Sequence, residues 1–94
     1  MANVTLLGVT LTIARPEQFA TPAGAQRMLR DSTLQRQLMA VPTAWACDTL
    51  ARFGIPHDGS RQEALLLLTW YMAGFVHAKA AGALLHYVTS VKEN

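Results

Sequence analysis

Apolar and polar residues alternate with a period of two near the start of the chain. The apolar positions of this segment are Leu7, Val9, Leu11 and Ile13, and glycine or threonine fills the positions between them. Such alternation with β-branched residues is typical of a strand with one buried face. We therefore predict one short N-terminal β-strand over about residues 4–15. Pro16 ends it, because proline has no N–H for a ladder hydrogen bond.

This strand needs a partner for its backbone N–H and C=O groups. The later sequence contains no second segment that is typical of a strand. We therefore expect pairing with a symmetry-related copy, or with a partner protein by strand addition. The residues expected in this pairing are Val9, Leu11 and Ile13. The alternative is a tight hairpin around Leu7-Gly8, in which residues 4–6 pair with residues 9–13.

Helix signals begin after the strand. Thr21 is suited to cap a helix and Pro22 to occupy its first position, which predicts a helix over about residues 22–40. The polar run at residues 31–33 interrupts the apolar pattern and can cap a second segment, so a break there is the alternative.

A proline sets the next boundary. The residue before Pro42 avoids the α-helical region of backbone space, so a new helix is expected over residues 43–53. Gly54 follows this helix and is suited to end it in a left-handed cap.

The last helix begins at a capping box, Ser60-Arg61-Gln62-Glu63. In this motif the Ser60 hydroxyl accepts from the N–H of Glu63, and the Glu63 carboxylate accepts from the N–H of Ser60. The helix is predicted over residues 60–91 and is about 45 Å long at about 1.5 Å per residue. That length exceeds the diameter of a compact domain of this size, so the helix either projects or breaks near Gly82.

This long helix has almost no charged face. Residues 64–91 contain one Lys and no Asp, Glu or Pro. A helix of this composition must be covered on nearly every side. The cover is either the earlier helices of the same chain or, over one half, a second copy or a target protein. A membrane span is the third interpretation, but Lys79 would lie near mid-span and the apolar run Ala64–Val76 has only 13 residues.

Small residues recur every four positions along the same helix. Gly74, Ala78 and Gly82 share one face, with Ala81 beside them. This spacing lets two helix backbones approach closely, and glycine costs up to about 1 kcal/mol in a helix relative to alanine. The residues expected at a helix-packing interface are Leu67, Gly74, Ala78, Ala81, Gly82 and Leu85.

These elements predict a mainly α fold in one domain, residues 1–94. The expected architecture is a small bundle of three to five helices with one short N-terminal β-strand and a long apolar C-terminal helix. The chain is 51% hydrophobic and 15% charged, whereas an average soluble domain is about 25% charged. Either the core is unusually complete or an apolar face is left over for a partner. Asn3-Val4-Thr5 stands where a signal peptide has basic residues, so a cytoplasmic location is expected.

Residue types that perform catalysis are scattered along the sequence. His77 and His86 lie nine residues apart, on opposite sides of one helix, and His57 lies in a loop. Cys47 is the single cysteine and has no histidine near it, so we expect a small buried hydrophobe. We expect a protein that is not an enzyme and has no catalytic residues, metal site or cofactor. The net charge is +2, and the loosely spaced arginines do not predict the basic face of a nucleic-acid binder.

Residues 34–72 resemble a ribbon-helix-helix DNA-binding domain. The resemblance lies in a proline that opens a helix, a glycine-containing turn and the Ser-Arg-x-Glu pattern at residues 60–63. It implies a strand over residues 34–41 whose Gln35 and Gln37 enter the major groove. It also implies a DNA-binding transcriptional regulator as the alternative function.

The excess apolar helix and the unpaired strand favour association over chemistry. We therefore expect a non-enzymatic protein-protein interaction module that binds a partner protein and occludes or adapts its surface. This is the style of small inhibitor or accessory proteins encoded by phages and mobile elements. A homodimer is expected, while nucleic acid and membrane are not expected partners.

Overall fold

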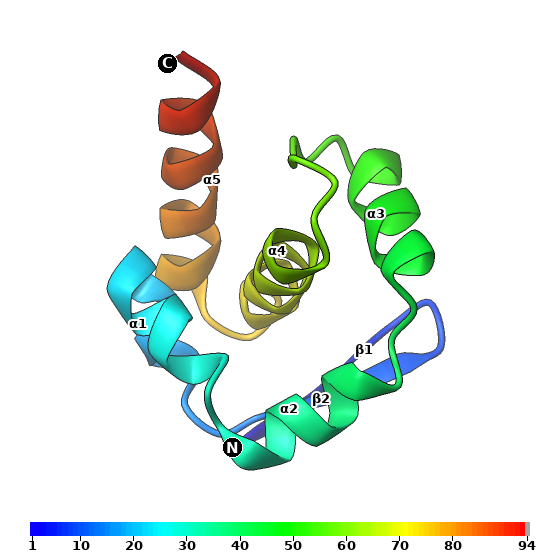
Figure 1. The fold of residues 1–94 in the computed structure, drawn as a ribbon. Helices are drawn as coiled ribbons and strands as arrows, with labels where there is room; N and C mark the ends of the chain where they lie inside the picture. The colour runs from blue at the N-terminus through cyan, green and yellow to red at the C-terminus, as the bar shows by residue number, and fades with distance from the viewer. Residues whose placement is uncertain (94) are drawn as a thin grey trace.

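The computed structural model describes the backbone of residues 1–93 and the side chains of residues 1–90. A β-hairpin comes first, then a 3-10 helix and five α-helices, so the described chain is mainly helical. α4 lies at the centre, with α1 and α5 on one side, α3 on the other, and α2 and the hairpin below (Figure 1). The elements are β1 (Ala2–Leu6), β2 (Val9–Ile13), η1 (Pro16–Ala20), α1 (Pro22–Met28), α2 (Ser32–Met39), α3 (Thr43–Arg52), α4 (Arg61–Ala73) and α5 (Ala78–Glu93).

The N-terminal strand pairs within its own chain. β1 and β2 are antiparallel, and Val9, Leu11 and Ile13 lie opposite Leu6, Val4 and Ala2. The prediction that these three residues pair with another copy is therefore wrong, and the hairpin alternative is correct. Its two-residue turn, Leu7-Gly8, has positive φ at both positions, as a hairpin turn of this kind requires. Because a leucine rarely adopts a positive φ, the sequence alone does not predict a turn at this position.

The free edge of β2 is covered by α2. The side-chain oxygen of Gln37 accepts from the backbone N–H of Thr12 at 2.7 Å, and its amide nitrogen donates to the Thr12 hydroxyl at 3.0 Å. Residues 34–41, which the ribbon-helix-helix resemblance places in a strand, are helical over most of their length. The resemblance is therefore wrong about this segment. Gln35 and Gln37 lie on a helix, and Gln37 binds the chain's own hairpin.

The predicted helix over residues 22–40 is broken, as the alternative allowed. Thr21 caps α1 by accepting from the N–H of Gly24 at 3.0 Å. Asp31 then caps α2 by accepting from the N–H of Leu34 at 2.9 Å, so α2 begins at Ser32.

The long apolar C-terminal helix predicted over residues 60–91 is wrong. α4 ends at Ala73, residues 74–77 form a turn, and α5 begins at Ala78. The break does not fall at Gly82. Gly74 lies against Ala81, and a Cβ added at Gly74 would lie 3.0 Å from the Ala81 Cβ. The turn folds α5 back onto η1 and α4, which buries more apolar surface than a projecting helix would.

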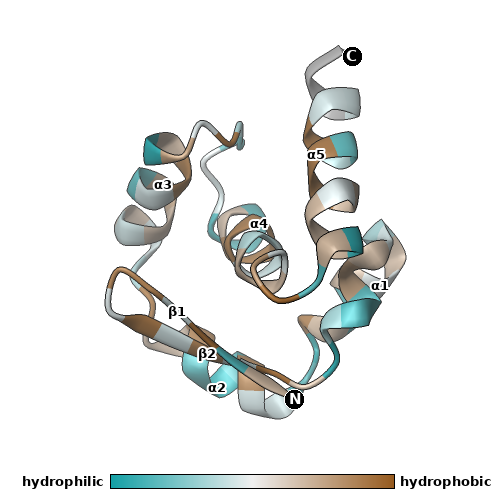
Figure 2. Cartoon of the chain, turned by 180° about the vertical axis from the view of Figure 1, so that it is seen from behind, coloured by the Kyte–Doolittle hydropathy of each residue, from teal (hydrophilic) through white to brown (hydrophobic). Residues whose placement is uncertain are grey.

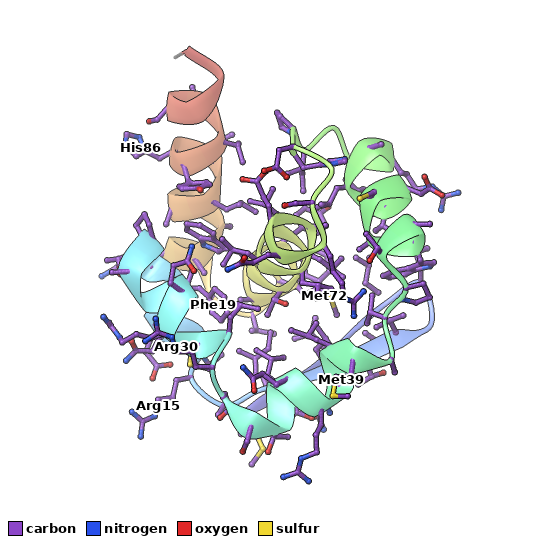
Figure 3. The ribbon with its side chains drawn as sticks, in the orientation of Figure 1. Arg15, Phe19, Arg30, Met39, Met72 and His86 are labelled. Carbon is purple, nitrogen blue, oxygen red and sulfur yellow. The ribbon has the colours of Figure 1, made fainter. Side chains whose placement is uncertain are left out.

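The hydrophobic core surrounds α4. Figure 2 shows this helix coloured mainly as hydrophobic and enclosed by the other elements. Trp70 is fully buried, and its indole N–H donates to the backbone carbonyl of Phe19 at 2.8 Å. Phe19 and Met72 point into the interior, whereas Arg15, Met39 and His86 point outward (Figure 3). Within the described residues, no helix has the length and apolar character needed to cross a membrane.

Arg61 joins the start of α4 to the end of α2. Its guanidinium donates to the carbonyls of Val41 at 2.7 Å and Leu38 at 3.1 Å, and to the Thr43 hydroxyl at 3.0 Å. The last carbonyls of a helix have no partner within the helix. The Leu38 carbonyl also accepts from the N–H of Val41, so Arg61 adds a second donor there and binds the Val41 carbonyl just beyond α2.

We expect Arg61→Ala to lower the free energy of unfolding by about 1.5–3 kcal/mol, the range for hydrogen bonds to a charged group. The measurement is equilibrium urea unfolding followed by circular dichroism. Arg30→Ala is the matched control, because Arg30 is exposed, and its cost should stay within about 0.5 kcal/mol. Equal costs for the two variants would contradict the role assigned to Arg61.

Candidate functional site

Three aromatic rings meet where α3 and α4 end. The rings of Phe53 and Tyr71 are stacked with centroids 5.2 Å apart, and the rings of Tyr71 and Phe75 meet edge to face at 5.0 Å. Phe53 caps the end of α3, Tyr71 lies in the last turn of α4, and Phe75 lies in the turn before α5. Phe53 and Phe75 remain 39% and 50% exposed. The three rings therefore form a row that is open to solvent.

This row is one wall of a groove of about 320 Å³, whose other wall is α5. We call it the aromatic groove. Its lining residues, all uncharged, are Phe53, Gly54, Ile55, Tyr71, Gly74, Phe75, Ala81, Leu84, Leu85 and Val88. The groove therefore suits an apolar side chain and offers no ionised group for catalysis among the residues that line it.

The outer face of α5 continues the groove. Ala78, Ala81, Gly82 and Leu85 are all exposed, and their spacing places them on one side of the helix. Leu85 is 67% exposed, and Val76 in the preceding turn is 48% exposed. We call the aromatic groove together with Ala78 and Gly82 the apolar surface.

The structure separates the residues that the sequence assigned to a helix-packing interface. Gly74, Ala81 and Leu85 line the aromatic groove, and Ala78 and Gly82 adjoin it on α5. Leu67 is 1% exposed and belongs to the core of its own chain, away from the lining of the aromatic groove. Gly74 also lies at the contact between α4 and α5, where it packs against Ala81.

Sequence reasoning missed Phe53, Tyr71 and Phe75 as one group. The three residues belong to segments that the helix pattern treats separately. The two neighbouring glycines are the sequence feature that indicates helix ends at these aromatic residues. Gly54 has a φ of 72° and turns the chain after Phe53, and Gly74 ends α4 just before Phe75.

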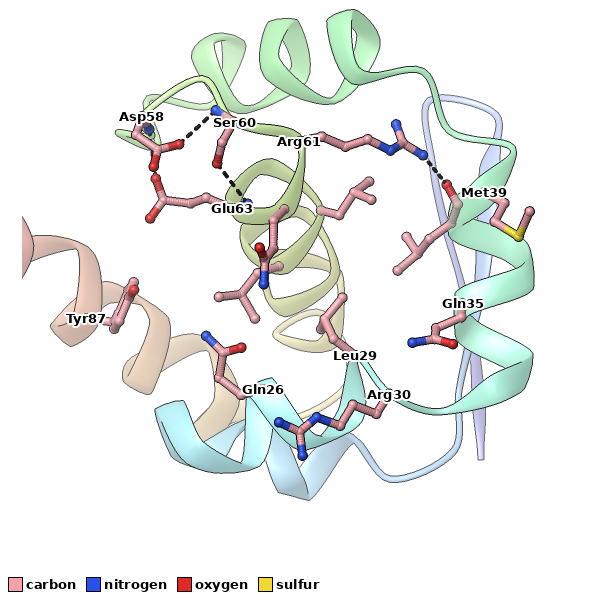
Figure 4. Close-up of a pocket in the computed structure, with 14 residues that line it drawn as sticks. Gln26, Leu29, Arg30, Gln35, Met39, Asp58, Ser60, Arg61, Glu63 and Tyr87 are labelled. Atoms are coloured by element: carbon pink, nitrogen blue, oxygen red, sulfur yellow. Dashed lines mark hydrogen bonds between the residues drawn. The ribbon is translucent and has the colours of Figure 1, made fainter.

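A second, polar groove of about 620 Å³ lies on the side of the molecule where α1 and α2 face α4 (Figure 4). Gln26 and Gln35 point into it, and Asp58, Ser60 and Glu63 line its far end. These polar side chains come from four different elements or loops. The groove offers hydrogen-bonding groups above an apolar floor, which consists of Leu29, Leu38, Leu65 and Leu66.

The carboxylates of the polar groove are engaged at the start of α4. The Ser60 hydroxyl accepts from the N–H of Glu63 at 3.3 Å, as the capping box predicts. The Glu63 carboxylate, however, accepts from the N–H of Asp58 at 2.7 Å, and the Asp58 carboxylate accepts from the N–H of Ser60 at 2.8 Å. Hydrogen bonding from the side chain and the N–H of Ser60 lowers the pKa of Asp58 below its usual value. Both acids thus order the loop before α4.

The side chains that could bind a metal lie apart. No group of three His, Cys, Asp or Glu residues that could hold a metal ion occurs among the residues that the structure describes. His57 accepts from the N–H of Gly59 at 3.2 Å, and the Cys47 thiol lies 3.9 Å from the Gly59 carbonyl oxygen. Comparison with protein-family models, curated proteins and solved structures finds no match to this chain. The apolar surface itself is therefore the basis for assigning a function.

Proposed function

We propose that this chain is a non-enzymatic protein-interaction module that binds a partner protein through the apolar surface and occludes or adapts that partner. The observation that carries the proposal is the open aromatic groove beside an exposed leucine. Phe53, Phe75 and Leu85 are all large hydrophobic residues left exposed around one depression.

An arrangement of this kind matches how proteins recognise one another. Binding energy at interfaces concentrates in a few aromatic and other large anchors near the centre of the contact. A groove between helices accepts the apolar face of an amphipathic helix through side chains spaced three and four residues apart. The partner surface that fits here is such a helix, with leucine or phenylalanine side chains for the groove.

Site-specific crosslinking tests this function. A photoreactive amino acid is placed at Leu85 in one variant and at Met39 in the other, and both are illuminated in the cells that produce the protein. Met39 is the matched control, because it is 79% exposed and lies on α2, away from the apolar surface. We expect a different protein to be captured from position 85 and not from position 39. Capture of no other protein at position 85, or equal capture at both positions, would contradict the proposal.

A further inference from the structure

The apolar surface has a projection and a hollow side by side. Leu85 is one of the residues that line the aromatic groove of about 320 Å³, and it extends from α5 with 67% of its surface exposed. A two-fold symmetric interface requires this combination, because the same patch on each subunit must be complementary to itself. We infer that, in the absence of a partner protein, a second copy of this chain occupies the apolar surface. This inference rests on the proposed function, since both use the same surface.

The available area matches what a stable dimer needs. The chain exposes 5407 Å², and an interface of standard size takes about 800 Å² from each subunit, or about 15% of that total. Homodimer interfaces are about 65% apolar, so about 500 Å² of this must be apolar. From the exposed fractions of Phe53, Phe75 and Leu85, together with the small residues of α5, the apolar surface supplies on the order of 500 Å².

Gly82 fits close contact between two α5 helices. Unlike Gly74, which lies against Ala81, Gly82 has no neighbouring atom within 4 Å of where a Cβ would be, among the described residues. Packing within the chain therefore gives no reason for glycine at this helical position, where alanine is preferred. An antiparallel crossing of two α5 helices at Gly82 brings the backbones together and directs Leu85 of each copy toward the aromatic groove of the other.

The charge distribution agrees with this arrangement. The residues that line the aromatic groove are uncharged, and so are Ala78 and Gly82, which lie beside it on α5. Lys79 and His86 are also exposed on α5, but their helical positions place them beside the apolar face. An uncharged centre with polar groups at its margin is the pattern found in protein interfaces.

Sedimentation equilibrium of the purified chain over a concentration series tests the inference. We expect a monomer–dimer equilibrium. Leu85→Lys should raise the dissociation constant by about 30-fold or more, because it places a charge at the position of a central anchor. Gly82→Leu should weaken the dimer by holding the two backbones apart. Met39→Lys is the matched control, since Met39 is 79% exposed elsewhere, and it should leave the equilibrium unchanged. Circular dichroism confirms that each variant is folded.

The outcomes separate this inference from the proposed function. A chain that is monomeric throughout the series, or a dimer that Leu85→Lys leaves intact, overturns the inference. If crosslinking at position 85 then still captures another protein, the proposed function stands without the dimer. A dimer that Leu85→Lys dissociates supports the inference, even when crosslinking captures only the chain itself and the proposed binding to a different protein fails.

Discussion

Trp70→Ala is expected to lower the free energy of unfolding by about 3–5 kcal/mol, the range for removing a large aromatic side chain from a packed core. Trp70 is fully buried in the last turn of α4, and its ring lies 5.1 Å from the ring of Tyr87 on α5. Its indole N–H also holds the carbonyl of Phe19 in η1. Alanine therefore leaves a cavity and an unpaired carbonyl in one step. Since small domains are stable by about 5–15 kcal/mol in total, much of the stability is lost.

Equilibrium urea unfolding followed by far-ultraviolet circular dichroism measures this effect. Trp45→Ala is the matched control, because Trp45 is only partly buried, on α3, and it should cost clearly less. Trp70→Phe separates the two contributions: it keeps an aromatic ring but leaves the Phe19 carbonyl without its donor, which costs about 1–3 kcal/mol. A cost for Trp70→Ala no larger than that of Trp45→Ala would contradict the position given to Trp70 in the core.

The parts of the fold that the sequence predicts are those with local signals. Thr21 marks the start of α1 and Ser60 the start of α4, because each side chain caps the N–H groups that follow it within three residues. The break after α4 has no such signal. Gly74 and Gly82 are equivalent in a helical pattern, and only the tertiary contact between Gly74 and Ala81 distinguishes them.

The hairpin turn and the aromatic groove likewise depend on tertiary contacts that the sequence does not predict. Leu7 adopts a φ of 49°, and a leucine in the sequence does not predict a positive φ. The turn therefore depends on the packing of the buried residues Val4 and Leu11 in the two strands that it joins. The outer face of α5 could be predicted, because the spacing of Ala78 and Leu85 follows helical periodicity. The aromatic groove could not, because its rings come from separate segments that meet only in the folded chain.

One substitution, glycine to alanine, is expected to have opposite effects at two helical positions. Gly24 is buried in α1, where a Cβ would overlap the backbone carbonyl of Gln18 in η1. Since backbone atoms cannot move aside as a flexible side chain can, Gly24→Ala should lower the free energy of unfolding by about 3 kcal/mol. Gly82 is exposed in α5 with open space around it. Gly82→Ala should raise the free energy of unfolding by about 0.5–1 kcal/mol through helix propensity alone.

Both alanine variants are best measured by urea unfolding in a Leu85→Lys background. That background removes the proposed dimer, because association would stabilise the folded state and obscure the effect at Gly82. Loss of stability at position 24 with a gain at position 82 is the expected pair of results. A gain at position 24 would mean that α1 does not pack against η1 as closely as the structure has it. A loss at position 82 in the monomeric background would mean that Gly82 serves the fold of the single chain, and its place at the centre of a two-fold contact would lose its support.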